Sequence, residues 1–375
     1  MRGAVVLGAS GLVGQRLQQR LANHPMFSLR ALAGSQRTAG MNPIELPWGL
    51  EGRAPSLDLP PVLDVQDPGL VEHLRDLGVS WAFSAVPSDV ALALEPRLVD
   101  GGIQVCSNAS AYRRRTGIPL VVADVNPNHL QTRPEGSVLH ACATNCTLIP
   151  LLMPYLALHR AFGVRTYTAT SEQARSGAGY GLLRGEVPFS FDIPGEAEKT
   201  MGELTWIAGD LHEGTVHPST VDGQMRCQRV DEADGHIIDV VFELASDVTL
   251  PEVQAALDAF ATHPQHFIND LVRAAYRLQG LGHQYDVEHT VVEVVQPLGV
   301  EVLFDHRNPL AHASGDVIGV DLQAETGGLA LPLQEVEQGA VAAAQVENVV
   351  AGLDPLLDDV QIGSHTPTSR ATRSM

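Results

Sequence analysis

Cys146 is the residue whose type and position most directly suggest covalent chemistry. It lies in HACATNCTLIP, residues 140–150, a pattern typical of a strand followed by a helix. A thiol at a helix start has its pKa lowered by the helix dipole and by free backbone N–H groups, which can also hold an oxyanion. The pattern predicts a thiolate nucleophile at Cys146, with a small buried side chain as the alternative.

A glycine-rich loop near the start of the chain predicts a nucleotide site. Three glycines form a GxxGxxG pattern between an apolar run at 3–7 and a segment with leucines at helical spacing. Backbone N–H groups at such a helix start favour a pyrophosphate, and a tight turn without a ligand is the alternative. The positions expected to contact the cofactor are Gly8, Ser10, Gly11, Leu12, Val13 and Gly14.

The residues after a second apolar run, 27–34, favour NADP over NAD. Sites for NAD commonly carry an acidic residue there, which binds the ribose hydroxyls. This chain has Ser35, Arg37 and Thr38 instead, and these groups can bind a 2′-phosphate. The alternative interpretation of Arg37 is a solvated surface charge.

Two kinds of sheet are expected to position these residues. Apolar runs typical of a parallel sheet occur at 3–7, 27–34, 81–87, 102–108 and 118–125, and the first two form a βαβ unit. Polar and apolar residues alternate at 164–174 and 236–245, which indicates an antiparallel or mixed sheet with one covered face. Further strands are expected at 287–295, 299–304 and 316–323, and helices at 249–281 and 335–353.

Length and charge limit the classes of function. At 375 residues the chain exceeds the size at which one core keeps growing, so two domains are expected. The formal net charge of −20 opposes binding to nucleic acid, and no apolar run reaches the roughly 20 residues that span a membrane. Four scattered cysteines without a CxxC pair indicate neither a disulfide framework nor a metal site. We expect a soluble, cytoplasmic protein.

The order of several short motifs adds a family resemblance. These motifs are GASGLVG, SQRTAG, FSAVPSDVA (83–91), SNASAYR (107–113), PLVVADVNPNHL (119–130), TNCT, EQARSGAGY (172–180), GEAEK (195–199) and CQRVDEADGH (227–236). As a set, over residues 3–245, they resemble aspartate-semialdehyde dehydrogenase, in the branch of archaea and fungi that malonyl-CoA reductases share.

The resemblance implies a fold and an assembly. The expected fold class is α/β, with a Rossmann-type NADP-binding domain at 1–145 that a C-terminal helix at 335–360 completes. An α+β catalytic and dimerisation domain is expected at 146–334, and a disordered tail at 364–375. The implied assembly is a homodimer or homotetramer.

The resemblance also implies a reaction in which Cys146 attacks an acyl phosphate, phosphate leaves, and NADPH reduces the thioester to an aldehyde. By this resemblance, Gln173 orients the substrate and His236 exchanges protons with the thiol and the hemithioacetal. The implied substrate-binding positions are Arg229 for the carboxylate, Arg113, Lys199 and Glu196 for phosphate, and Asn145. Further implied cofactor positions are Ser84, Pro87, Ser176 and Gly177.

Simpler interpretations exist for some of these residues. His236 also fits a turn residue, Arg113 an exposed surface arginine, and Lys199 with Glu196 a surface ion pair. Arg229 and His236 are expected on one strand, where their offset of seven residues requires a bend. Gly235 is suited to provide one.

The resemblance weakens after residue 250. The family's asparagine for the nicotinamide amide is absent, and Gln334 or Glu335 is expected near that place. Glu172 and Arg175 put charges where this branch usually carries apolar residues. Three hypotheses remain: reduction of L-aspartyl 4-phosphate, reduction of an acyl-CoA such as malonyl-CoA, and a non-catalytic NADP-binding paralogue.

Overall fold

A six-stranded parallel sheet forms the first part of the structure, a computed structural model that describes residues 1–50, 52–122, 125–262, 290–295 and 301–304. The strand order is β3-β2-β1-β4-β5-β6, with every neighbouring pair parallel. This order reverses direction between β1 and β4, which is where ligands bind in folds of this type. The bounds are β1 (Arg2–Leu7), β2 (Phe27–Gly34), β3 (Leu63–Asp64), β4 (Val79–Ser84), β5 (Gln104–Ser107) and β6 (His140–Cys142).

Helices cover both faces of this sheet. Ala4 and Val6 of β1 pack into one core with residues of α1, whereas Val5 and Leu7 pack into another core with residues of α2 and α3. Both faces of a parallel strand are therefore buried, which explains its continuous apolar run. The predicted α/β fold with a Rossmann-type sheet is confirmed. The helices are α1 (Leu12–Leu21), α2 (Leu70–Asp76) and α3 (Ser88–Asp100).

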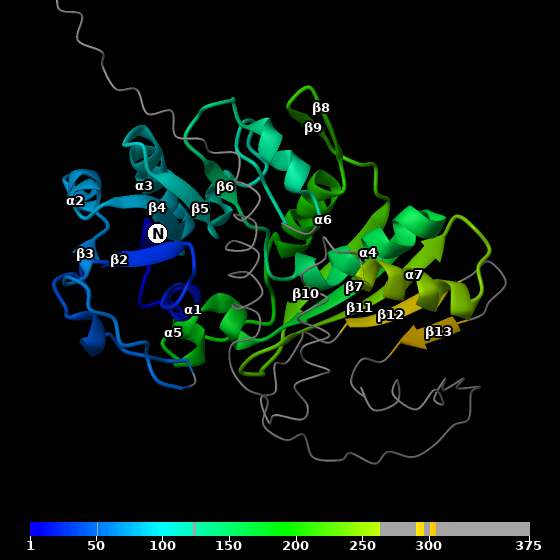
Figure 1. Cartoon of the computed structure of the whole chain (residues 1–375). Coiled ribbons are helices and arrows are strands. Elements are labelled where there is room, and N and C mark those ends of the chain that lie inside the picture. Colours follow the sequence, from blue (N-terminus) through cyan, green and yellow to red (C-terminus); the bar gives the residue numbers. More distant parts are fainter. Residues whose placement is uncertain (51, 123–124, 263–289, 296–300, 305–375) are drawn as a thin grey trace, which may run out of the picture.

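A mixed five-stranded sheet forms the second part, in green and yellow in Figure 1. Its order is β10-β7-β11-β12-β13, in which β7 runs parallel to β10 and antiparallel to β11. The predicted alternation in 164–174 and 236–245 thus corresponds to two paired strands. The bounds are β7 (Val164–Gln173), β10 (Gly223–Arg229), β11 (His236–Leu244), β12 (Thr290–Val295) and β13 (Glu301–Phe304).

Helices α4 and α7 cover one face of the mixed sheet (Figure 1). Leu152 and Tyr155 of α4 share a core with Tyr167 of β7 and Phe242 of β11. Alternate residues such as Thr168 and Asp239 are exposed on the other face. The remaining elements are α4 (Leu148–Phe162), α5 (Tyr180–Leu183), α6 (Glu196–Ile207), α7 (Leu250–Thr262) and the hairpin β8 (Asp210–His212) and β9 (Thr215–His217).

The strand predicted at 118–125 is wrong as a full strand. Leu120 makes only an isolated parallel bridge with Cys142, and the sixth strand of the sheet is β6. The side chain of Asn126 explains the difference, since it donates to the Leu120 carbonyl at 3.0 Å and accepts from the Val122 N–H at 2.8 Å. These backbone groups are therefore taken by a side chain and do not extend the ladder.

Several predictions fall outside the described residues. These are the helices at 335–353 and 335–360, the strand at 316–323, the tail at 364–375, the part of the predicted helix beyond α7, and Gln334 and Glu335. The division into domains at 1–145 and 146–334 stays a prediction. Within the described part of the chain, no helix is both long and apolar enough to cross a membrane.

Candidate active site

Cys146 lies between β6 and α4, just before the residue that caps the helix. The cap is Thr147, and α4 begins at Leu148. Asn145 holds the helix start because its Oδ1 atom accepts the Leu148 N–H at 2.9 Å. The thiol is therefore next to the helix N-terminus, as predicted, but outside its first turn.

The thiol pKa departs from the prediction. The pKa of Cys146 is raised from its usual 9.0 to about 11, first by burial and then by the charge of Glu196, although Arg113 and hydrogen bonds with Thr147 act to lower it. The expected lowering by the helix is wrong for the ligand-free protein, because removal from water outweighs it. A base is therefore needed to generate thiolate near neutral pH.

His236 is placed to be that base. Its Nε2 atom lies 3.3 Å from Sγ of Cys146, and its side chain is buried. Its Nδ1 atom has no hydrogen-bond partner among the described residues. An imidazole with a proton on Nδ1 accepts through Nε2, so the thiol can donate its proton to His236.

Gln173 lies between Arg229 and His236 in one row across three strands. It pairs with Arg229 of β10 on one side and with His236 of β11 on the other. The prediction that Arg229 and His236 share a strand is wrong. They lie on different strands that flank β7, and the chain between them turns at Gly235, whose φ is 90°.

The row faces the nucleophile. The amide of Gln173 donates to Thr147 Oγ1 at 2.5 Å, which joins β7 to the start of α4. Arg229 is buried, and its Nη1 atom donates to the Ala174 carbonyl at 2.9 Å. Burial lowers the pKa of Arg229, while nearby Cys146 and Glu196 raise it. The Arg229 guanidinium is therefore close enough to Cys146 for the charges of the two groups to interact.

Gly177 lies directly beside these side chains. A Cβ at this position would be 3.0 Å from Cε1 of His236, 3.2 Å from its Nε2 and 3.5 Å from Nη1 of Arg229. The position therefore has little room for a side chain. Ser176, its neighbour, donates its hydroxyl to Asp234 Oδ1 at 2.5 Å, so that hydroxyl already has a protein partner.

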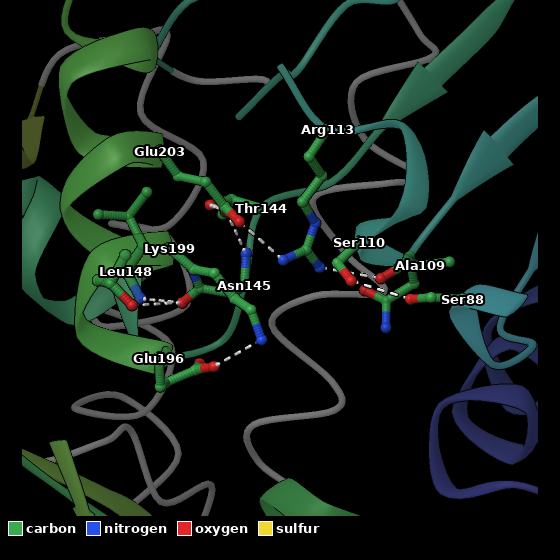
Figure 2. Close-up of polar contacts among 12 residues, drawn as sticks. Ser88, Ala109, Ser110, Arg113, Thr144, Asn145, Leu148, Glu196, Lys199 and Glu203 are labelled. Carbon is green, nitrogen blue, oxygen red and sulfur yellow. Dashed lines mark hydrogen bonds and ion pairs between the residues drawn. The ribbon is translucent and has the colours of Figure 1, made fainter. Parts of the chain in front are cut away.

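The predicted phosphate ligands gather around α6 (Figure 2). Arg113 is mostly buried, and its Nη1 atom lies 3.0 Å from Oε1 of Glu203. Lys199 is half exposed, and its Nζ atom lies 3.9 Å from Glu196 Oε2 on the same helix. The alternative of an exposed Arg113 is therefore excluded, whereas Lys199 and Glu196 do form the i,i+3 ion pair considered above.

Glu203 is the residue that the sequence interpretation missed. It follows Glu196 and Lys199 by seven and four positions, so helical spacing puts all three on one side of α6. A carboxylate at a buried position of an amphipathic helix was the available signal. Its side chain is only 3% exposed.

The glycine loop has the close packing that a nucleotide cradle needs. Gly8 has a φ of +79°, and a Cβ there would lie 2.4 Å from the Ala85 carbonyl oxygen. A Cβ on Gly14 would lie 2.1 Å from the Gly8 carbonyl oxygen. The loop opens α1 at Gly11 without a side-chain cap, which leaves backbone N–H groups for an anion. Ser10, Leu12 and Val13 lie in this same turn.

The other predicted cofactor positions lie at the ends of neighbouring strands. Ser84 ends β4 at the point where the strand order reverses, and its buried Oγ has no partner among the described residues. Pro87 directly precedes α3. Ser35 and Arg37 are exposed beyond the end of β2, whereas Thr38 folds back and donates its hydroxyl to the Ser35 carbonyl at 3.2 Å. These residues fit a dinucleotide that extends from β4 across β1 to β2.

Comparison with known proteins identifies the family. An aspartate-semialdehyde dehydrogenase from Methanothermobacter thermautotrophicus is 36% identical over 273 residues, which cover 69% of this chain and 76% of that protein. The chain belongs to the aspartate-semialdehyde dehydrogenase family. The resemblance inferred from the motifs is confirmed.

Three further matches agree with membership of the aspartate-semialdehyde dehydrogenase family. The Semialdehyde dehydrogenase, NAD binding domain model matches residues 4–133. A crystal structure of the Candida albicans aspartate semialdehyde dehydrogenase with NADP is 30% identical, with a TM-score of 0.58, and the match covers 68% of this chain and 76% of that one. The Saccharomyces cerevisiae aspartate-semialdehyde dehydrogenase is 32% identical, over 62% of this chain and 68% of its own length.

Glu172 and Arg175, the two charges expected to depart from this branch, are paired outside the row. Glu172 accepts from the Gln228 amide at 2.9 Å, on the opposite face of β7 from Gln173. Arg175 forms an ion pair with Asp231. Glu172 thus links β7 to β10, Arg175 pairs with the segment between β10 and β11, and neither pairing involves a residue of the row that faces Cys146.

Proposed function

We propose that this protein reduces L-aspartyl 4-phosphate to the semialdehyde with NADPH, releasing phosphate, through a thioester on Cys146. The observation that carries the proposal is the 3.3 Å separation of Cys146 Sγ and His236 Nε2, beside Gln173 and Arg229. Family membership supports the substrate, since the related proteins are named for this semialdehyde. NADP is supported by its presence in the related Candida structure.

The first step forms the thioester. His236 Nε2 takes the proton of the Cys146 thiol, and the thiolate adds to the acyl carbon. The carbon–oxygen bond to phosphate then breaks, and the leaving group departs with its electron pair. Arg113 and Lys199 bind that phosphate, while Arg229 holds the substrate carboxylate through its guanidinium fork.

The second step needs NADPH. The residues of this chain that are predicted to bind the cofactor fit it. The glycine loop of Gly8, Gly11 and Gly14 would hold the pyrophosphate, and the exposed Ser35 and Arg37 the 2′-phosphate. When bound, NADPH supplies the hydride that reduces the thioester carbon. Gly177 leaves the space beside His236 free of a side chain.

The third step releases the aldehyde. His236 first gives the proton that it took from the thiol to the oxyanion left by reduction of the thioester carbon, which forms the hemithioacetal. It takes this proton back as the carbon–sulfur bond breaks, and returns it to the Cys146 thiolate. Gln173 holds the start of α4 through Thr147 and keeps the thiol beside the substrate. The imidazole of His236 thus moves protons in the first and third steps.

The test is the reverse reaction, oxidation of the aldehyde by NADP⁺ with and without inorganic phosphate, on the wild type and Cys146→Ser. We expect phosphate-dependent NADPH formation by the wild type and none by the variant. Equal turnover by both proteins would refute the covalent mechanism. Replacement of phosphate by coenzyme A tests acyl-CoA reduction, and a faster reaction with coenzyme A would change the assigned substrate.

We also propose that the protein acts in the cytoplasm as a homodimer or homotetramer, as its resemblance implies. Sedimentation of the purified chain measures the assembly directly. An active monomer would contradict this part of the proposal.

A further inference from the structure

Glu203 joins two segments that the proposed reaction brings together. Its Oε1 atom lies 3.0 Å from Arg113 Nη1, and its Oε2 atom accepts from Thr144 Oγ1 at 2.6 Å and from the Asn145 N–H at 2.8 Å (Figure 2). The first contact reaches the residue proposed to bind phosphate. The second set reaches the residues directly before Cys146.

A buried carboxylate makes this connection geometrically strict. Glu203 is buried, so the guanidinium and both hydrogen bonds must supply the partners that water would otherwise give to its two oxygens. The two oxygens of one carboxylate are held at a fixed separation. Their contacts therefore fix the position of Arg113 relative to the segment that carries the nucleophile.

A second contact on the same helix supports this role of α6. Arg114 has a φ of 59°, an unusual conformation for a residue other than glycine. A Cβ on Gly202 would lie only 2.3 Å from Arg114 Nη1, so the guanidinium lies against the bare backbone. Neighbouring residues of α6 thus position neighbouring arginines of the 113–114 segment.

Unpartnered donors beside Glu203 indicate what this arrangement is for. Among the described residues, the buried Arg113 Nε and Asn145 Nδ2 atoms have no hydrogen-bond partner. Both belong to residues that Glu203 fixes through other atoms. Such donors are costly to bury unless an acceptor arrives, and a phosphate oxygen is a suitable acceptor.

We infer that Glu203 is a positioning residue, which sets Arg113 and Asn145 at the distance that binds the phosphate leaving group next to Cys146. This inference rests on the proposed function. The contacts of Glu203 are with Arg113 and the 144–145 segment, and it acts through them. Loss of Glu203 should therefore weaken the binding of phosphate more than the binding of the aldehyde or NADP⁺.

The test is Glu203→Gln in the phosphate-dependent oxidation of the aldehyde. Glutamine offers one acceptor oxygen and cannot serve both Arg113 and the Asn145 N–H. We expect the KM for phosphate to rise by about 10- to 100-fold, the range that follows from losing a hydrogen bond to a charged group. The KM values for the aldehyde and NADP⁺ should change less than about threefold, and Glu203→Asp, with the charge but a shorter reach, should restore only part of the loss.

Glu198→Gln, an exposed carboxylate on the same helix, is the matched control and should leave all three KM values unchanged. A lower KM for phosphate in Glu203→Gln would overturn the inference, because it would mean that Glu203 only weakens the charge of Arg113. Equal increases in all three KM values would also overturn it. If that variant does not fold, Thr144→Val removes one Oε2 contact and should raise the phosphate KM by about threefold; an unchanged value would count against the inference.

The wild type separates the two proposals. Absence of phosphate-dependent oxidation by the wild type would defeat the proposed function itself. Normal wild-type activity with an unaltered Glu203→Gln variant would defeat only the role of Glu203.

Discussion

The Nε2 atom of His236 lies 3.3 Å from Sγ of Cys146, although 90 positions separate the two residues in the chain. The turn at Gly235 and the pairing of β11 with β7 bring the imidazole to the end of the mixed sheet where α4 begins. The pKa of the thiol is raised to about 11, so the thiol is protonated at neutral pH. The contact therefore supplies the base that removes the thiol proton. The start of α4 alone does not lower the thiol pKa enough to make this base unnecessary.

The pH dependence of thiol alkylation should reveal this protonated state. The pKa of Cys146 is raised from 9.0 to about 11, so the thiol is neutral through pH 9 and half ionised only near pH 11. In the ligand-free protein, the rate of its reaction with iodoacetamide should rise about tenfold per pH unit between pH 7 and 10. Peptide mass spectrometry measures the rate at Cys146 separately from the other cysteines. A rate that levels off below pH 8 would mean that a thiolate–imidazolium pair already exists at rest.

Gly177→Ala should lower kcat more than it weakens NADP⁺ binding. The added methyl group would press on the His236 ring and on Arg229 at 3.0–3.5 Å. Displacement of the reacting His236 imidazole by this methyl group should lower kcat by about 10- to 100-fold. Steady-state kinetics and NADP⁺ titration measure the two effects. Gly69→Ala is the control, since its Cβ meets its nearest neighbour at an ordinary 3.4 Å; equal kcat values for the two variants would disprove the crowding.

Arg37→Ala should weaken the binding of NADP⁺ and leave the binding of NAD⁺ unaffected. The guanidinium is exposed beyond β2, where the adenosine 2′-phosphate is expected. Loss of a charge-assisted contact should raise the KM for NADP⁺ by about 10- to 100-fold. Arg30→Ala, an exposed arginine within β2, serves as the control. A parallel rise in the KM for NAD⁺ would show that the effect is not on the 2′-phosphate.

Glu95→Ala should destabilise the parallel-sheet part of the protein. Glu95 is fully buried in α3, where it accepts from Ser107 Oγ at 2.7 Å and contacts His140 Nε2 at 2.9 Å. Its removal leaves two buried polar side chains without this partner, at a cost of about 3–5 kcal/mol in the free energy of unfolding. Urea unfolding measures the change, with the exposed Glu72→Ala of α2 as the control. A loss under about 1 kcal/mol would mean that the pair is replaced by other partners.

The first βαβ unit could be predicted from the sequence because local signals determine it. An apolar run, a glycine loop, leucines at helical spacing and a second apolar run give β1, α1 and β2, and the predicted run at 27–34 has the bounds of β2. The strand at 118–125 could not be predicted correctly, because the Asn126 side chain competes for its backbone groups. That competition depends on a turn whose geometry the apolar pattern does not encode.

The candidate site was predictable in its residues but less so in its electrostatics. Motif resemblance singled out Cys146, Gln173, Arg229 and His236, and the structure brings them together. Burial of the thiol, which reverses the direction of its pKa shift, depends on tertiary packing. Glu203 was missed for the same reason, since its partners are 58–90 positions away in the chain.

Protonation of Cys146 at rest has a consequence for the durability of the protein. Peroxides attack thiolates far faster than thiols, and the later products of that attack are irreversible. A sulfur with a pKa of about 11 presents almost no thiolate to such oxidants at neutral pH. The nucleophile becomes vulnerable only while His236 holds its proton, which in the proposed reaction is also when an acyl group is present to trap it.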